Sequence, residues 1–169
     1  MKQKQRMKIF MLLFFLFPAM LFAQDCQLKK EKDQFTQQDR LTTGFIQLTN
    51  SKLSITADSK ELDFFIAASN DKCFDENSTL SVVFDDGHSK LNFRNSGSMN
   101  CQGLFHFTIR NTATPNFNLQ RLAAKKVKAL VLTNDKAVTS ILLNADQQQA
   151  LQTAADCMAK QAATLIAKP

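Results

Sequence analysis

Four cysteines spread along the chain constrain its fold more than any other feature of the sequence. They are Cys26, Cys73, Cys101 and Cys157. No two of them lie close enough in sequence to form a CxxC redox motif or a zinc-binding pair. An even number of cysteines in an exported chain favours disulfide bonds, and here it predicts two. Four cysteines allow three connectivities, and their number alone does not choose between them.

The first 23 residues have the pattern of a secretory signal peptide. Four basic residues and no acidic residue precede an uncharged run at 9–23, in which Phe, Leu and Met dominate. This run is shorter than the ~20 residues that a helix needs to cross a bilayer. A basic start, an apolar run and a small residue at the exit are typical of a cleaved export signal. We predict cleavage between Ala23 and Gln24, which leaves 24–169 as a single domain with no membrane span.

Cys26 is the third residue of the predicted mature chain. A bacterial lipoprotein signal needs a small residue directly before the modified cysteine, whereas Asp25 holds that place here. We therefore expect Cys26 to be half of a disulfide and not a lipid anchor. The protein is expected to be periplasmic or extracellular.

The basic charge of the chain belongs mostly to the export signal. The whole sequence holds 21 basic and 15 acidic residues, a net charge of +6. Removing the four basic residues of the signal leaves 17 against 15, a net charge of +2. The mature protein therefore lacks the strong positive charge of a nucleic-acid-binding domain, and no nucleic-acid partner is expected. The oligomeric state is left open.

Alternating apolar and polar residues predict antiparallel strands before residue 112. The clearest signal is a β-hairpin at 79–95, because apolar residues alternate on both sides of the turn pair Asp86-Gly87, where glycine tolerates a positive φ. The polar stretch 25–40 is expected to be an irregular lead-in. Further strands are predicted at 44–57, with a turn inside it, at 61–69 and at 103–111.

Helical patterns appear after Pro115. Asn118 is expected to cap a short helix near 118–126, and 127–144 is then expected to form a second hairpin. An alternative makes 118–134 one longer helix, since its apolar residues partly fit that period as well. Asn144 and Gln147 have the spacing of a capping box, and apolar residues at helical spacing follow them. We therefore predict an amphipathic C-terminal helix.

The order of these elements, with strands first and a helix last, favours an α+β domain. We predict an antiparallel sheet of about seven to eight strands with the C-terminal helix packed on it. Cys73 precedes the central hairpin and Cys101 follows it. If the strands at 62–69 and 103–110 neighbour that hairpin, both cysteines lie at one end of the sheet. Cys157 lies at the edge of the apolar stripe of the last helix, where the N-terminal segment could reach it. This favours the pairs Cys26–Cys157 and Cys73–Cys101.

A series of short motifs is similar to that of a known family. The series comprises an N-terminal cysteine, KDQFT, a cysteine before an FDDG hairpin, NCQGLFHF, KKVKALVLT and a cysteine in the last helix. In their order and spacing, the mature chain resembles a family of small uncharacterised secreted four-cysteine proteins of Bacteroidetes-type bacteria. The resemblance implies the same disulfide pairing and implies no activity. The chain departs from the family in having neither Tyr nor Trp.

Few residues indicate catalysis or the binding of a metal ion or cofactor. Asp85, Asp86 and His88 could bind a metal ion or exchange protons, although such a group around an Asp-Gly turn is typical of a solvated turn. His106 is expected to have a structural role on its strand. The chain lacks a GxSxG motif, and its four glycines form no phosphate-binding pattern, so no cofactor is predicted.

The sequence favours a secreted or periplasmic, non-enzymatic binding or interaction module with an unidentified partner in the envelope or outside the cell. The alternative is a small metal-dependent hydrolase that uses Asp85, Asp86 and His88. Small size and disulfides favour the binding module, and so does the lack of a recognisable catalytic set.

Overall fold

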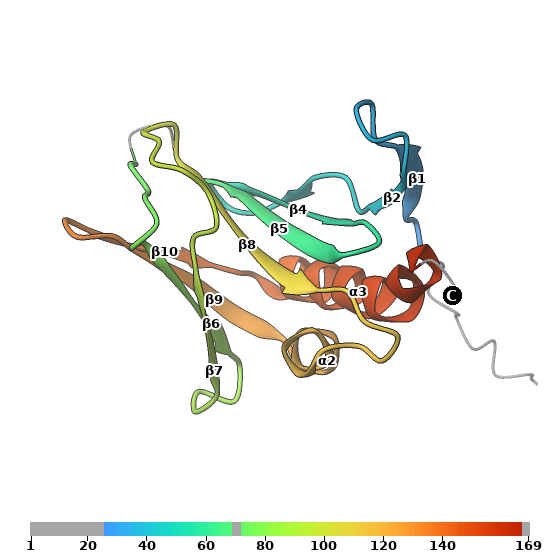
Figure 1. Ribbon diagram of the computed structural model, residues 1–169. Helices are drawn as coiled ribbons and strands as arrows, with labels where there is room; N and C mark the ends of the chain where they lie inside the picture. The colour runs from blue at the N-terminus through green and yellow to red at the C-terminus, as the bar shows by residue number, and fades with distance from the viewer. Residues whose placement is uncertain (1–25, 69–71, 167–169) are drawn as a thin grey trace, which may run out of the picture.

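The computed structural model describes residues 26–68 and 72–166, which form two antiparallel sheets and a helical layer (Figure 1). The predicted signal peptide and its cleavage site lie outside the described residues. The first sheet contains β1 (Lys29–Lys32), β2 (Asp39–Thr42), β3 (Ile46–Gln47), β4 (Lys52–Ala57), β5 (Glu61–Ala67) and β8 (Leu104–Arg110). The second sheet contains β6 (Thr79–Phe84), β7 (Lys90–Arg94), β9 (Val127–Thr133) and β10 (Val138–Leu142). The α+β class is confirmed, with two sheets in place of one.

The pairing of β5 with β8 explains why there are two sheets. These strands pair directly, with Phe64 opposite Phe107, although the central hairpin β6–β7 lies between them in sequence. The hairpin therefore has no place between β5 and β8, and it pairs with β9 in a second sheet. The condition that the strands at 62–69 and 103–110 neighbour the hairpin, from which we expected Cys73 and Cys101 at one end of the sheet, is not met, because these strands pair with each other. Cys73 and Cys101 nevertheless meet beyond the ends of these strands and are bonded.

Three phenylalanines join the two sheets across a shared core. Phe107 of the first sheet stacks on Phe64 of the same sheet, with 4.7 Å between ring centroids, and on Phe93 of the second sheet at 4.0 Å. In both sheets every second residue along a strand points inward and is buried, as the alternation of buried and half-buried residues in β6 shows. One continuous apolar cluster results, so both sheets depend on the same core.

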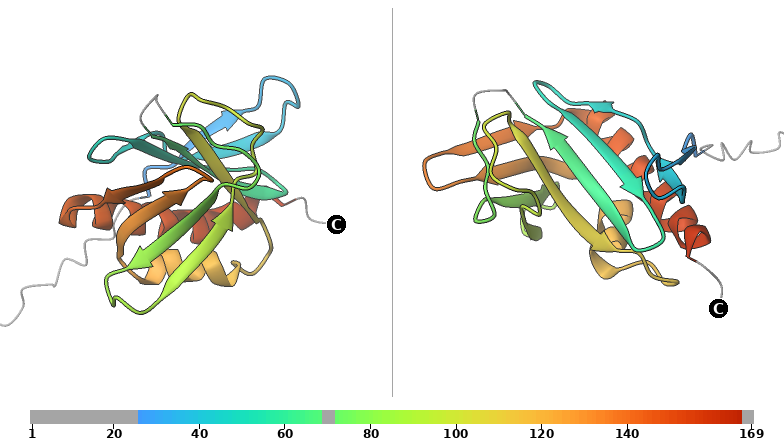
Figure 2. Two further views of the ribbon diagram at one scale, coloured as in Figure 1. Left: turned by 90° about the vertical axis from the view of Figure 1, so that its left-hand side faces the viewer. Right: turned by 45° about the horizontal axis from the view of Figure 1, so that its top comes forward.

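Both helices of the described residues lie on the inner side of the first sheet, so neither covers its outer face (Figure 2). α2 spans Phe117–Ala124, and α3 spans Ala145–Gln161 and continues as a 3₁₀ turn, Ala162–Leu165. α3 packs against α2 and contacts β4 and β9. None of the helices among the described residues is long and apolar enough to cross a membrane.

The helix ends confirm one prediction and correct two. The capping box of α3 is present, because Asn144 accepts from the Gln147 N–H and the Gln147 side chain accepts from the Asn144 N–H. The cap of α2 is Asn116 and not Asn118, whose N–H donates to the Asn116 side chain at 2.9 Å. The alternative of a single helix over 118–134 is wrong, because β9 begins at Val127.

The N-terminal segment is more regular than expected. Residues 29–42 form the β1–β2 hairpin, so the prediction of an irregular lead-in over 25–40 is wrong. The four residues of β1 are all exposed and charged, so the strand has no apolar alternation by which to recognise it. Backbone pairing forms this hairpin, together with an ion pair of 2.8 Å between Lys30 and Asp39. The disulfide Cys26–Cys157 ties the segment to α3, as predicted.

Candidate functional site

A polar groove on the outer face of the first sheet is the candidate functional site. It has a volume of about 500 Å³ and lies between the sheet surface, the β1–β2 hairpin and the segment after β7. The hairpin stands above this face (Figure 1). Every residue that lines the groove is polar: Asp33, Thr36, Gln38, Arg40, Thr56, Asp58, Lys60, Glu61, Asp63, Ser96, His106 and Thr108. We call this site the polar groove.

The floor of the groove follows from the period of two along β5 and β8. Buried residues alternate on both strands with more exposed ones, which places Asp63, His106 and Thr108 on the outer face. In the observed register Asp63 lies opposite Thr108 and diagonal to His106. The His106 Nδ1 atom lies 3.1 Å from an oxygen of Asp63. An acid and an imidazole are thus in hydrogen-bond contact at the floor of the groove.

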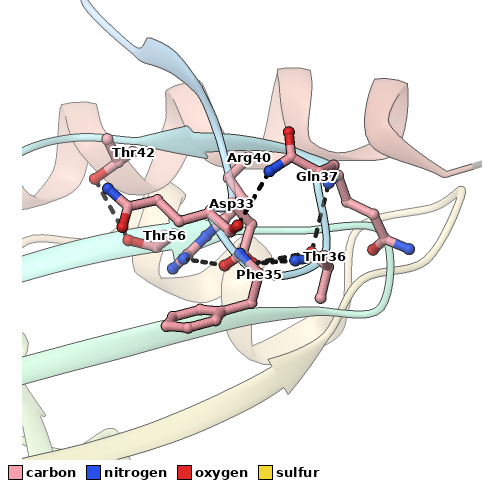
Figure 3. A network of polar contacts seen from close by, with 9 residues as sticks. Asp33, Phe35, Thr36, Gln37, Arg40, Thr42 and Thr56 are labelled. Carbon is pink, nitrogen blue, oxygen red and sulfur yellow. Dashed lines mark hydrogen bonds and ion pairs between the residues drawn. The ribbon is translucent and has the colours of Figure 1, made fainter.

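The β1–β2 hairpin forms one wall of the groove (Figure 3). Its turn is organised by Asp33, which accepts hydrogen bonds from the N–H of Phe35 and from the N–H and hydroxyl groups of Thr36. Arg40 donates to the second carboxylate oxygen at 2.9 Å. These bonds, above all that from the Thr36 N–H, lower the pKa of Asp33 to about 2. The carboxylate therefore stays ionised and holds the wall in place.

The stability of the protein should fall at low pH because of Asp33. A carboxyl whose pKa is lower in the folded state stabilises that state above its unfolded pKa, near 3.8, and loses this contribution as the pH falls through about 2. Asp33→Asn should therefore be less stable than the native protein at neutral pH, and the difference should shrink between pH 4 and pH 2. Urea unfolding of both proteins across this range measures the difference, and a constant value would contradict the assignment.

The segment after β7 forms the opposite wall and closely approaches His106. The Ser96 N–H donates to the His106 carbonyl at 2.7 Å, and the His106 N–H donates to the Asn95 side chain at 3.1 Å. A Cβ atom at Gly97 would lie 2.5 Å from the His106 Nε2 atom. A side chain at position 97 would push the imidazole aside, so glycine keeps this wall against the groove floor.

The residues that sequence analysis considered for a metal site lie elsewhere. Asp85, Asp86 and His88 are at the exposed β6–β7 turn, where Gly87 has a φ of +71°, as the hairpin prediction required. The carboxylate of Asp86 accepts from the Ser89 hydroxyl and from the Lys125 ammonium group at 2.7 Å.

The bond from Lys125 and those from Ser89 hold the pKa of Asp86 far below its usual value, so this carboxylate is engaged within the turn. No group of three or more His, Cys, Asp or Glu side chains suited to a metal ion occurs within 26–68 and 72–166. The hydrolase alternative stays a hypothesis without structural support.

Sequence analysis did not identify the polar groove, although it placed His106 on the polar face of its strand. Asp63 and His106 are 43 residues apart, and their contact depends on the pairing of β5 with β8. The wall formed by the β1–β2 hairpin was also missed, because that segment was expected to be irregular. The one available signal in the sequence was the alternation of apolar and polar residues along β5 and β8, which indicates one apolar and one polar face for each strand.

Comparison of the chain with protein-family models, with curated proteins and with solved structures found no match. The resemblance to secreted four-cysteine proteins of Bacteroidetes-type bacteria therefore stays a prediction. A proposal of function therefore depends on the polar groove and on the fold that positions its residues.

Proposed function

We propose that the mature protein is an exported, non-enzymatic binding module that holds an uncharged, hydroxyl-rich molecule, such as a short glycan, in the polar groove. The observation that carries this proposal is the lining of the groove, in which none of the twelve residues is apolar. Its volume of about 500 Å³ lies within the range of small-molecule sites, roughly 300–1,000 Å³.

The lining favours a ligand that brings its own hydrogen-bonding groups. Most small-molecule sites are lined mainly by apolar side chains, which favour apolar ligands. A polar surface is hydrated before binding, and displacing its water is favourable only when the ligand replaces the lost hydrogen bonds. Gln38, Glu61 and Thr108 make no side-chain hydrogen bond to any described residue, so their amide, carboxylate and hydroxyl groups are available.

The charges of the groove argue against an anionic ligand. Four carboxylates line it, against the two permanent cations Arg40 and Lys60. Asp33 is paired with Arg40, whereas the Asp63 carboxylate contacts the His106 imidazole, so the lining keeps more carboxylates than permanent cations. Anions would meet a small excess of negative charge, whereas neutral hydroxyl groups can donate to the carboxylates at no such cost.

An aromatic ring lies beside the groove. Phe35, at the tip of the β1–β2 hairpin, is 94% exposed and is flanked by two residues of the groove wall, Asp33 and Thr36. A fully exposed phenylalanine side chain does not stabilise the fold by burial. It offers an apolar surface on which the carbon–hydrogen face of a sugar ring could lie, although it has no polar group of its own.

Export is the part of this proposal that the sequence supports most. The N-terminal segment has the pattern of a cleaved signal, and two disulfides are typical of proteins that fold in an oxidising compartment. A binding module in the periplasm or outside the cell would meet envelope or extracellular glycans there. Its partner is thus expected in that compartment.

Changing two free polar groups of the groove should weaken ligand binding at least tenfold. The variant Glu61→Gln/Thr108→Val replaces a carboxylate, which accepts charge-assisted hydrogen bonds, with a neutral amide of the same shape, and it replaces a hydroxyl with a methyl group; hydrogen bonds of these two kinds are worth about 0.5–3 kcal/mol each. Isothermal titration of the mature protein with neutral di- to tetrasaccharides would measure the affinities. The matched control is Thr79→Val, which removes a half-exposed hydroxyl from the second sheet.

Two results would count against the proposal. Saccharide binding that is equally strong in the groove variant and in Thr79→Val would place the ligand elsewhere. Binding of polyamines but of no saccharide would show that the carboxylates select a cation, and that the groove does not recognise hydroxyl groups.

A further inference from the structure

The exposed edges of the two sheets differ in how they are protected. An unpaired strand edge offers N–H and C=O groups to any other strand, and proteins usually block it with charges, with short strands or with covering segments. The edge strand β1 carries four charged, exposed residues. The edge strand β7 exposes Lys90 and Arg94. On β8, Asn100 bonds to the backbone of Leu104, and Ser96 bonds to that of His106.

β10 is less protected, and among the described residues its edge is covered only at its last residue, Leu142. Its sequence, VTSIL, contains no charge and no proline, and it is rich in residues that favour strands. Val138 and Leu142 are 66% and 64% exposed on the outer face of the second sheet. The β9–β10 hairpin extends beyond the body of the molecule (Figure 1).

The hydrogen bonds of the β9–β10 ladder show which way each backbone group of β10 points. Just beyond the strand, the Leu143 N–H donates to the Lys128 carbonyl at 3.0 Å, so Leu143 faces β9. In an antiparallel pair, successive residues point their N–H and C=O groups alternately toward the partner strand and away from it. Ile141 and Thr139 therefore also face β9.

Val138, Ser140 and Leu142 consequently direct their backbone groups to the free side of β10. The Leu142 carbonyl accepts a hydrogen bond from the Thr49 hydroxyl at 3.1 Å, which closes that end of the edge. Across 26–68 and 72–166, no hydrogen bond reaches the backbone groups of Val138 and Ser140. The N–H and C=O groups of these two residues thus remain available in the first three residues of the strand.

We propose that this edge pairs with β10 of a second copy of the same chain, about a two-fold axis that passes through Thr139. Val138 of each copy then faces Ser140 of the other, and four N–H···O=C hydrogen bonds join the two second sheets into one continuous sheet. A two-fold contact brings the same surface of each copy together, so it is favoured where that surface is self-complementary. The uncharged β10 meets this condition, because no like charges oppose each other.

The charges at the ends of β10 support a second copy as the partner. Lys136 lies two residues before β10, and Asp146 lies in the first turn of α3, four residues after Leu142. In the two-fold register the paired residues are 138–140, and Lys136 of one copy lies beyond them, toward the Leu142 end of the other, which leads into the α3 turn that carries Asp146. This places residues of opposite charge at the same ends of the paired strands. The pairing involves the second sheet and does not rest on the proposed ligand.

Ser140→Pro tests this pairing without breaking the hairpin. The Ser140 N–H faces away from β9, and proline is tolerated at such edge positions. Sedimentation velocity of the mature protein should show a monomer–dimer equilibrium that shifts toward the dimer as the concentration rises. Ser140→Pro should be monomeric. Asn92→Pro makes the same change on the other edge of the second sheet and should dimerise like the native protein.

A second variant and a local measurement keep the test decisive if Ser140→Pro does not fold. Val138→Lys places a charge on an exposed side chain and should weaken the dimer, because each copy then brings a lysine into the contact. Hydrogen exchange should show protection of the Val138 and Ser140 amides that increases with protein concentration. A native protein that stays monomeric up to millimolar concentration would overturn the proposal, and so would a dimer that persists in both variants.

Discussion

The double variant Cys26→Ser/Cys157→Ser should unfold with a free energy up to about 5 kcal/mol below that of the native protein. The bond joins residues 131 positions apart, so its loss restores a large conformational entropy to the unfolded chain. Residual structure in the reduced chain makes this figure an upper value. Against a typical total of ~5–15 kcal/mol, the loss is large enough to bring the protein close to unfolding.

The structure also predicts where this loss acts first. β1 begins three residues after Cys26, and the hairpin that it forms is joined to β4 through only two residue pairs of β2, Leu41–Ala57 and Thr42–Thr56. Freed from α3, the hairpin should loosen before the rest of the first sheet does. Urea unfolding gives the stability, and amide hydrogen exchange over residues 29–42 gives the local effect.

Cys73→Ser/Cys101→Ser serves as the comparison. This bond closes a loop of 28 positions, for which the same model gives about 3–4 kcal/mol. Its loss should affect the segments next to β5, β6 and β8 and leave the exchange of residues 29–42 almost unchanged. Equal loss of protection at residues 29–42 in both double variants would show that Cys26–Cys157 does not hold the groove wall.

Phe107→Ala should destabilise the protein by about 3–5 kcal/mol. The side chain is 3% exposed and stacks on one phenylalanine of each sheet, Phe64 and Phe93. Truncation therefore leaves a cavity at the contact between the sheets, in addition to the lost transfer energy of the ring. The midpoint of urea unfolding should fall while its slope is retained.

The control for this variant is Phe35→Ala. Phe35 is 94% exposed, and a surface substitution of this kind usually changes stability by no more than about 0.5 kcal/mol. If Phe35 contacts the ligand, the same variant should weaken saccharide binding. A loss of stability as large as that of Phe107→Ala would contradict the description of Phe35 as a free side chain.

Local signals in the sequence were enough to predict the parts of the fold that depend on neighbouring residues. The β6–β7 hairpin follows from alternation around Asp86-Gly87, and the start of α3 follows from Asn144 and Gln147. The division into two sheets was not predictable in this way. It depends on whether β5 pairs with the next strand in sequence or with β8, and the period of two along each strand is compatible with either partner.

The polar groove was beyond sequence analysis for a related reason. Its floor needs the register that sets Asp63 beside His106, and its wall needs a hairpin whose strand β1 is charged throughout. A charged strand shows no apolar period, although its ion pairs and backbone bonds are sufficient to hold it at the edge of a sheet. The disulfides were predictable because the cysteine residues can be identified in the sequence whatever structure lies between them.

Mapping a bound saccharide by amide chemical shifts tests the central claim, that the polar groove is the ligand site, most directly. The mature protein, labelled with nitrogen-15, would be titrated with the tightest-binding neutral saccharide from the panel. We expect the largest shifts at residues 33–40 of the hairpin, at 60–63 and at 106–108, with residues of β7 and β10 unchanged. Shifts concentrated on the second sheet or on α3, with residues 60–63 and 106–108 unaffected, would contradict the assignment of the groove as the binding site.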